Sequence, residues 1–286
     1  MSSSNAVSTV PLAAIPIDDP DDPRVADYRA TRDRDLSAEG GRFVAESELV
    51  VRRLLASGLA VHSILVTAPR LRAIAEVLRG ATAPVYVAPQ AVLDAIAGFH
   101  VHRGCLAIGE RPATAFAEAG RTVAAALPAD ARTIVVLEDL VSADNIGACA
   151  RNAAAFGADA LVLSPRAADP FYRKAVRVSI GAVFQLPIVR SGDWPGDLAG
   201  LRAAGFVLFG AVVDPTATPL ALVRRGSGVK AALLLGAEGP GLSEAARAAC
   251  DHLITIPMSR GADSLNVATA GAIALYQLQQ ASGSLS

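Results

Sequence analysis

The sequence predicts an α/β protein made of two consecutive domains, each built from a sheet covered by helices. Three observations lead to this prediction. Short apolar segments typical of strands alternate with helical segments along most of the 286 residues. In the second half the apolar runs become continuous, which is typical of parallel strands buried on both faces. An Ala-rich segment with prolines near its ends, 111–131, separates the halves and is predicted to be a linker.

The first half is predicted to hold a disordered tail and a small α/β domain. Residues 1–22 have no basic segment, and prolines break their apolar part, so we expect a disordered tail rather than a signal peptide. Residues 23–110 form the predicted domain. Its predicted strands are 42–45, 61–67, 85–87 and 105–109. Its predicted helices are 24–35, 47–57, 71–79 and 91–97.

The second predicted domain, 132–286, contains the longer apolar segments, which we interpret as a parallel sheet. Its predicted strands are 134–137, 160–163, 184–189, 206–213, 231–235 and 253–256. We expect a final buried helix to begin at Ser264, where a run rich in Ala and Gly follows a polar loop.

Charge and cysteine content limit the possible functions. The formal net charge is −1 and the pI about 6.4, so any contact with RNA must come from local basic patches. Three separated cysteines argue against a disulfide framework or zinc site and fit the cytoplasm. The four histidines lack metal-ligand spacing, and no apolar run is long enough to cross a membrane. We therefore expect a cytoplasmic protein with no metal.

Polar loops follow three of the predicted strands in the second domain. Open α/β sheets bind ligands at the carboxyl ends of their strands. We therefore expect these loops, which lie near Asn145, Gly236 and Ser264, to form one pocket.

The first of these loops leads into a helix that carries Asn145 and Arg151. Asp144 or Asn145 is predicted to cap this helix. Arg151 lies among alanines, and an isolated charge in such a helix usually has a partner. Because side chains lean toward a helix N-terminus, we expect Arg151 to be able to reach back to the loop. A simple cap followed by a solvated arginine is the alternative.

The second loop is glycine-rich and contains one acid, Glu238. Its glycines permit positive φ angles and close approach of a ligand to the backbone. Their order matches neither the dinucleotide-binding fingerprint nor a Walker A loop. A carboxylate here would repel a pyrophosphate and suits an amine, a sulfonium or a hydroxyl to be oriented. A tight turn without a ligand is the alternative.

The third loop places Ser264 and Asn266 at the start of the last helix. Ser264 is explained as an N-cap, whereas capping leaves Asn266 unexplained and makes it the better ligand contact. Between the loops lies a basic segment that also contains Phe171 and Tyr172. Such a mixture can hold a phosphate backbone and stack a base, although a solvated helix face explains it equally well.

Together the three segments resemble the SpoU (TrmH-like) RNA ribose 2′-O-methyltransferases of the SPOUT superfamily. The matching residues are Asn145–Gly147 with Arg151, then Leu235–Gly241, then Ile256–Met258 with Ser264–Val267. The first domain resembles the small ribosomal-protein-like domain that many members carry. The resemblance implies a C-terminal trefoil-knot domain, S-adenosyl-L-methionine as methyl donor and a homodimer.

The resemblance also implies roles for individual residues. The reaction centre would be lined by Asn145, Arg151, Glu238, Ser264 and Asn266. The donor would be held by Leu235, Gly236, Ala237, Gly239, Gly241, Ile256, Met258 and Leu265. We predict that RNA is bound by Arg166, Arg173, Lys174 and Arg177.

The predicted substrate is ribosomal RNA, most specifically 23S RNA, in preference to tRNA. Three alternatives remain at this point: the same chemistry on tRNA, a non-catalytic RNA-binding or assembly factor on the same fold, and an unrelated nucleotide-binding enzyme such as an oxidoreductase.

Overall fold

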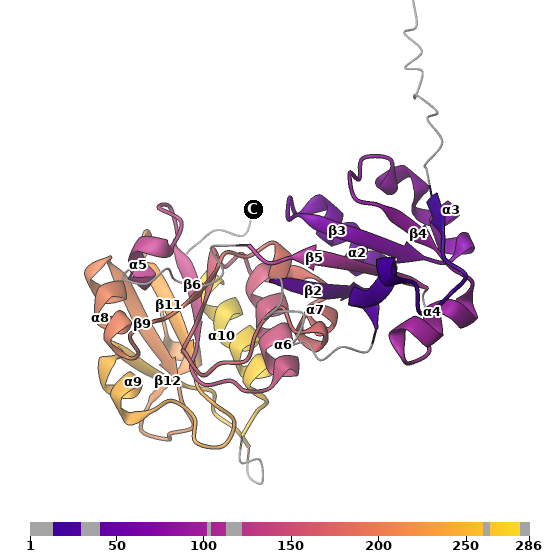
Figure 1. Cartoon of the computed structure of the whole chain (residues 1–286). Helices are drawn as coiled ribbons and strands as arrows, with labels where there is room; N and C mark the ends of the chain where they lie inside the picture. The colour runs from indigo at the N-terminus through magenta and orange to yellow at the C-terminus, as the bar shows by residue number, and fades with distance from the viewer. Residues whose placement is uncertain (1–13, 30–40, 102–103, 113–121, 260–263, 281–286) are drawn as a thin grey trace, which may run out of the picture. The chain divides into compact units, whose positions relative to one another are not determined.

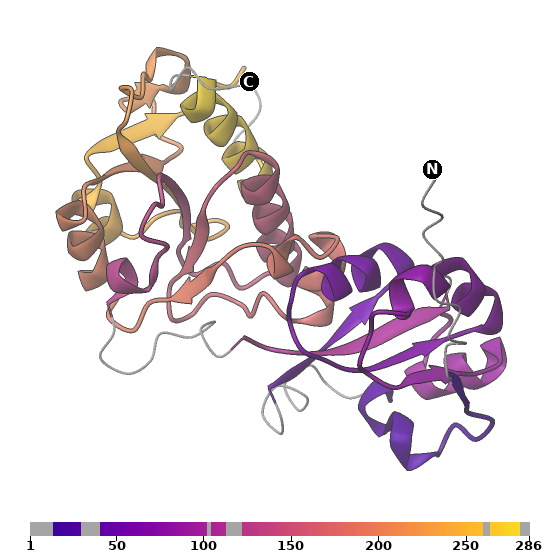
Figure 2. The same cartoon turned by 90° about the horizontal axis from the view of Figure 1, so that it is seen from above.

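The computed structural model describes residues 14–29, 41–101, 104–112, 122–259 and 264–280. The chain forms two compact units, Met1–Glu110 and Arg111–Ser286. Each unit is built around one sheet (Figure 1, Figure 2).

The first unit contains a five-stranded mixed sheet in the order β1-β4-β3-β5-β2. Strands β1, β4 and β3 are parallel, whereas β5 runs antiparallel to both β3 and β2. The strands are β1 Ala14–Pro16, β2 Arg42–Glu46, β3 Val61–Val66, β4 Val85–Val87 and β5 Cys105–Glu110. The helices are η1 Pro23–Tyr28, α2 Glu48–Ala56, α3 Ala68–Leu78 and α4 Gln90–Ala97.

Two expectations for the start of the chain are wrong. The end of the predicted disordered tail, Ala14–Pro16, pairs with β4, and the adjacent Ile17 is fully buried. The helix expected over 24–35 is a short 3-10 helix, η1, with a proline in its first turn. Tyr28 ends it in the core, where its hydroxyl lies 2.8 Å from that of Ser63. Residues 30–35 of that prediction lie outside the described part of the chain.

The second unit contains a seven-stranded sheet in the order β10-β12-β9-β11-β6-β7-β8, and all of its pairings are parallel. The strands are β6 Thr133–Leu137, β7 Ala160–Leu163, β8 Ile188–Arg190, β9 Phe206–Ala211, β10 Thr218–Pro219, β11 Lys230–Leu235 and β12 His252–Thr255. The helices are α5 Val123–Ala126, α6 Ala143–Ala155, α7 Arg173–Val178, η3 Ala182–Phe184, α8 Gly196–Ala203, η4 Leu220–Leu222, α9 Glu244–Ala249 and α10 Val267–Gln280.

Helices cover both faces of this sheet, with α5, α8 and α9 on one side and α6 and α10 on the other (Figure 1). Every residue of β6 is buried. The prediction of a parallel sheet buried on both faces is therefore confirmed. Small residues bring the helices close: a Cβ added to Gly147 of α6 would lie 2.5 Å from the carbonyl oxygen of Ala175 in α7.

The structure corrects two boundaries in this unit. The strand expected over 184–189 is preceded by η3, and only Ile188–Arg190 joins the sheet. Pro187, immediately before that strand, has no N–H with which to extend the pairing. The last helix begins at Val267 rather than Ser264.

Candidate active site

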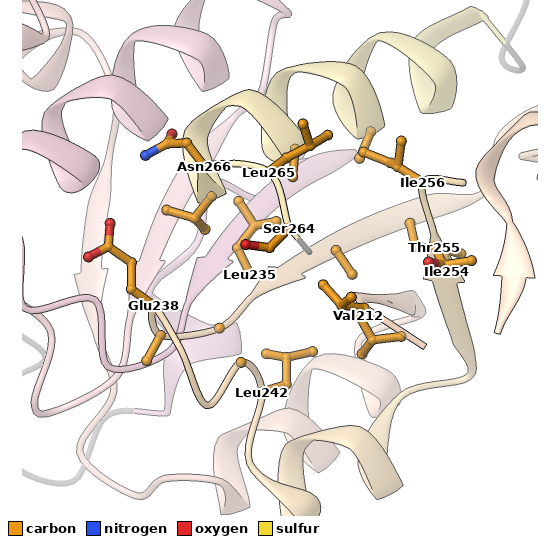
Figure 3. Close-up of a pocket in the computed structure, with 18 of the residues that line it drawn as sticks. Val212, Leu235, Glu238, Leu242, Ile254, Thr255, Ile256, Ser264, Leu265 and Asn266 are labelled. Atoms are coloured by element: carbon orange, nitrogen blue, oxygen red, sulfur yellow. The ribbon is translucent and has the colours of Figure 1, made fainter. Parts of the chain in front are cut away.

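A cavity of about 460 Å³ lies where β9, β11 and β12 end and α10 begins (Figure 3). It is lined by 211–213, 235–242, 254–256, 264–267 and the side chains of Leu220, Arg247, Met258, Ala270 and Ala274. Its volume falls within the usual range for small-molecule sites. The strand ends bring together segments that are far apart in the sequence, as expected for an open parallel sheet.

Residues 236–242 form the floor of the cavity as a tight turn. The main chains of Ala237 and Gly241 exchange two hydrogen bonds of 3.1 and 3.0 Å. A Cβ added to Gly236 would lie 2.1 Å from the carbonyl carbon of Gly241, so only glycine fits there. Gly239 and Gly241 have φ angles of 85° and 72°, which favour glycine. The backbone of this turn is therefore open to close approach by a ligand.

A chain of three polar side chains connects the three predicted loops. Asn145 donates a hydrogen bond from Nδ2 to Oε1 of Glu238 and accepts one at Oδ1 from Nδ2 of Asn266, at 3.0 Å. Oδ1 of Asn266 accepts from the N–H groups of Ala268 and Thr269 at 2.9 and 3.3 Å. Because these N–H groups only donate, they fix the direction of both amides. Each hydrogen bond in this series is therefore donated in the same direction, from the first turn of α10 toward the carboxylate of Glu238.

These contacts correct the assignment of two helix caps. Asn266, rather than Ser264, caps α10, because its side chain accepts the first free N–H groups of the helix. Ser142, rather than Asp144 or Asn145, caps α6, and it accepts weakly from the N–H of Asn145 at 3.5 Å. Asn145 is consequently free of a capping role and is 6% exposed.

Most of the predicted reaction-centre and donor residues line the cavity. All eight residues predicted to hold the donor line the cavity, and so do Glu238, Ser264 and Asn266. Asn145 is not among the residues that line the cavity, but it is hydrogen-bonded to Glu238, which is. Ser264 and Leu265 are exposed, and Figure 3 shows them with Asn266 at the start of α10. The functional roles of these residues stay predictions.

Arg151 lies apart from this cluster. It is exposed on α6 and is not among the residues that line the cavity. It lies six positions after Asn145, which rotates its direction by about 120° around the helix. In the described part of the chain its guanidinium forms no ion pair or hydrogen bond, so the expected reach back to the loop is not seen in this conformation.

Two of the predicted RNA-binding residues form ion pairs, one with the loop that precedes α6 and one with the first turn of that helix. Arg166 pairs with Asp139, and Lys174 pairs with Asp144. Burial favours the neutral form of Asp139, but hydrogen bonds from Arg166 and Ser164 hold its pKa below the usual range.

The four predicted RNA-binding residues differ in exposure. Arg166, Lys174 and Arg177 are exposed, whereas Arg173 is half-buried. Phe171 is buried under the guanidinium of Arg111, so it cannot stack a base as the sequence pattern suggested.

Several residues of the cavity were not predicted from the sequence. Val212 and Val213 follow directly on β9, so the strand-end rule could have found them. Arg247 of α9 lines the cavity and pairs with Asp214 at 2.8 Å, and no sequence signal marked it. Hydrogen bonds from Thr216 hold the pKa of Asp214 below its usual range.

The thiol of Cys149 on α6 is buried. Burial raises the pKa of Cys149 to about 12, which leaves its thiol protonated and unreactive. Within the described ranges no group of three histidine, cysteine or acidic side chains is placed to hold a metal ion. No helix in those ranges is long and apolar enough to span a membrane.

The second unit has a parallel sheet with a glycine-lined cavity at its strand ends, and the amide–carboxylate chain borders that cavity. These features define a ligand-binding α/β domain of the kind found in enzymes. The chain belongs to the SpoU rRNA Methylase family, whose sequence model matches residues 132–276. The family predicted from the three motifs is therefore confirmed.

Individual relatives extend the similarity beyond the second unit. An uncharacterized tRNA/rRNA methyltransferase of Mycobacterium bovis is 42% identical over 267 residues, covering 91% of this chain and 89% of the relative. The SpoU methyltransferase AviRb of Streptomyces viridochromogenes, solved in complex with AdoMet, is 27% identical with a TM-score of 0.72, covering 90% and 96% of the two chains. A solved RNA 2′-O ribose methyltransferase is 25% identical with a TM-score of 0.74, covering 93% and 99%.

Proposed function

We propose that this protein uses S-adenosyl-L-methionine to methylate a ribose 2′-hydroxyl of RNA, with 23S ribosomal RNA as the substrate. The observation that carries the proposal is the polar chain of Asn145, Glu238 and Asn266 beside a glycine-lined cavity. Membership of the SpoU family supports methyl transfer, and the solved ribose 2′-O methyltransferase that shares the fold supports the ribose.

S-adenosyl-L-methionine is the cofactor, and the cavity has the chemistry to accept it. Apolar side chains at one end, including Val212, Ile254 and Ile256, suit an adenine base. Glu238 at the polar end suits a cationic ligand and disfavours a pyrophosphate. Gly236 lets the turn close on its own backbone, whereas Gly239 and Gly241 face open space where a ligand can approach the backbone. When bound, the cofactor supplies an electrophilic methyl group on a sulfonium.

The polar chain orients the acceptor hydroxyl in this proposal. The second oxygen of Glu238 accepts no hydrogen bond from the described residues, and Glu238 is exposed at the cavity. It can therefore accept the proton of a ribose hydroxyl in a hydrogen bond. Asn145 holds the first oxygen and so fixes the plane of the carboxylate. Such positioning can supply much of a rate acceleration.

Arg151 acts on the RNA in this proposal. Because a guanidinium stays protonated, it is a poor general base. It instead holds the phosphate next to the target ribose and stabilises negative charge as the hydroxyl loses its proton. Its exposure and lack of a partner among the described residues keep it available for this task.

The RNA surface continues along α7 and the loop before it. Arg166, Lys174 and Arg177 are exposed and would contact phosphates, which position an RNA without reading its sequence. Ribosomal RNA is favoured over tRNA because the first unit resembles the small RNA-binding domain that more often accompanies ribosomal substrates. The proposed site of action is the cytoplasm.

We further propose that the second unit is a trefoil knot and that two chains form a homodimer. Two apolar side chains of α10, Ile273 and Tyr276, are 40% and 52% exposed and lie three residues apart on one face of the helix. An apolar helix face of this kind suits a contact with a second copy of the chain.

The test is transfer of a labelled methyl group to total RNA, followed by separation of the RNA by size. Mass spectrometry of the labelled nucleoside should identify a 2′-O-methyl ribose in the large ribosomal RNA. Label in tRNA would reassign the substrate, and label on a base or only on protein would overturn the ribose assignment. Donor binding without transfer to any RNA would favour a non-catalytic factor.

A further inference from the structure

Glu138 is a buried acid at the end of β6 that does not line the cavity. Glu138 is only 3% exposed. Burying a carboxylate is costly unless its oxygens are hydrogen-bonded. Three bonds satisfy it: Oε1 accepts from Nε1 of Trp194 at 2.7 Å and from Oγ of Ser243 at 2.6 Å, and Oε2 accepts from the N–H of Ser243 at 2.9 Å.

All three partners of this carboxylate are donors. An indole N–H and a backbone N–H can only donate. Because a carboxylate oxygen only accepts, the hydroxyl of Ser243 donates its proton to Glu138, while its oxygen accepts from the N–H of Ala246 at 3.1 Å. A neutral amide at position 138 would therefore have to turn an NH₂ group toward a donor, whichever way it was oriented.

Glu138 holds both ends of the turn that lines the cavity. Its own N–H donates to the carbonyl oxygen of Leu235, the last residue of β11, at 2.9 Å. Its carboxylate holds Ser243, the N-cap of α9. All seven residues between these two anchors, 236–242, line the cavity. One residue outside the cavity thus fixes where the floor of the cavity starts and where it ends.

We propose that Glu138 is a positioning residue for S-adenosyl-L-methionine binding, which acts by holding the 236–242 turn in the conformation that accepts the donor. This proposal rests on the assignment of the donor to the cavity. Glu138 touches neither the donor nor the RNA in this scheme. Its effect passes through Ser243 to the turn.

The test is calorimetric binding of S-adenosyl-L-methionine to the full chain, with E138Q as the variant. Because a hydrogen bond to a charged group is stronger than one to a neutral group, E138Q should raise the Kd on the order of tenfold to a hundredfold. Methyl transfer to RNA should show the loss mainly as a higher KM for the donor, with most of kcat recovered at saturation.

Two further variants form a matched pair, because each removes one donor to the same oxygen. S243A removes a donor at the end of the turn, whereas W194F removes a donor outside it and keeps an aromatic ring at that position. We expect S243A to raise the Kd and W194F to leave it within twofold. A thermal melt of each variant identifies a temperature at which all are folded, and the Kd is compared there.

The outcomes separate this proposal from the assignment of the donor. A wild-type chain that binds no S-adenosyl-L-methionine would overturn the donor assignment. A wild-type chain that binds it, with E138Q and S243A binding equally well despite lower melting temperatures, would reduce Glu138 to a structural role. Equal losses of affinity in S243A and W194F would also contradict action through the turn.

Discussion

The hydrogen bond between Asn145 and Glu238 can be tested by replacing its donor with an acceptor of the same shape. N145D keeps the volume of the side chain but puts a second carboxylate against Glu238. The donor that Asn266 offers to position 145 is kept, because the new carboxylate still accepts. The substitution therefore acts on one bond of the polar chain.

Two contributions set the expected magnitude. The lost hydrogen bond to a charged group is worth about 1.5–3 kcal/mol. Two carboxylates about 4 Å apart repel by about 4 kcal/mol at an effective dielectric constant of about 20. Solvent screens part of this repulsion because Glu238 is exposed, so about 1 kcal/mol of it is retained. The combined loss is about 3 kcal/mol, or about a hundredfold in rate if the bond is needed in the transition state.

The assay is methyl transfer to total RNA, measured from pH 5.5 to pH 8.5 and expressed relative to the wild type at each pH. Lowering the pH lets the two carboxylates share one proton, which restores a hydrogen bond between them. The relative activity of N145D should therefore rise as the pH falls. N145A, which offers neither donor nor acceptor, is the control and should show a low relative activity that does not change with pH.

Three results would refute the reasoning. Wild-type activity of N145D at pH 8.5 would show that the bond is not needed. A relative activity that stays flat with pH would remove the repulsion between carboxylates as the cause. The same rise in N145A would assign the pH effect to another group.

Three other predictions concern the donor, the phosphate contact and the RNA surface. R151A should lower methyl transfer by about a hundredfold or more while calorimetry finds donor binding within twofold, and near-normal turnover would exclude Arg151 from the chemistry. G236A should abolish measurable donor binding, because its Cβ would meet the backbone of the turn at 2.1 Å, whereas G200A, in α8 with open space around it, should bind the donor normally. R177A should weaken RNA binding in a filter assay and reduce the slope of log affinity against log salt by about one, while R202A, whose side chain pairs with Asp251 on another part of the unit, should leave the slope unchanged.

The sequence was sufficient to predict which loops meet, because parallel strands end at the same edge of their sheet. Leu235 and Ile256 are the last residues of two predicted strands, and both line the cavity. The glycines of 236–241 were recognisable from spacing because a backbone turn requires them locally. Features that one segment of the chain determines by itself, such as a strand end or a glycine turn, could therefore be predicted from the sequence.

Contacts between distant segments were not accessible in the same way. Glu138 reads in the sequence as an ordinary polar residue after a strand, and only the fold brings Ser243 and Trp194 to its oxygens. The sequence favours Asn266 as a ligand contact because Ser264 already supplies a predicted cap. In the structure its oxygen caps α10 while its nitrogen binds Asn145. One amide has two ends, so capping and a site contact do not exclude each other.

The separation of Asn145 and Arg151 on α6 bears on how the first motif works. The face of the helix that carries Asn145 also carries Asn152, which donates to the carbonyl oxygen of Ala268 at 2.8 Å and so keeps that face against α10. Arg151, about 100° from Asn152, is held in solvent by the same packing. The two residues of the motif therefore lie on different faces of one helix and have different roles in the proposal. Asn145 orients the carboxylate at the cavity, and Arg151 binds a ligand that approaches from solvent. If this division is correct, N145A and R151A should lower methyl transfer by different routes. R151A should weaken RNA binding with the donor Kd unchanged, whereas N145A should leave RNA binding intact.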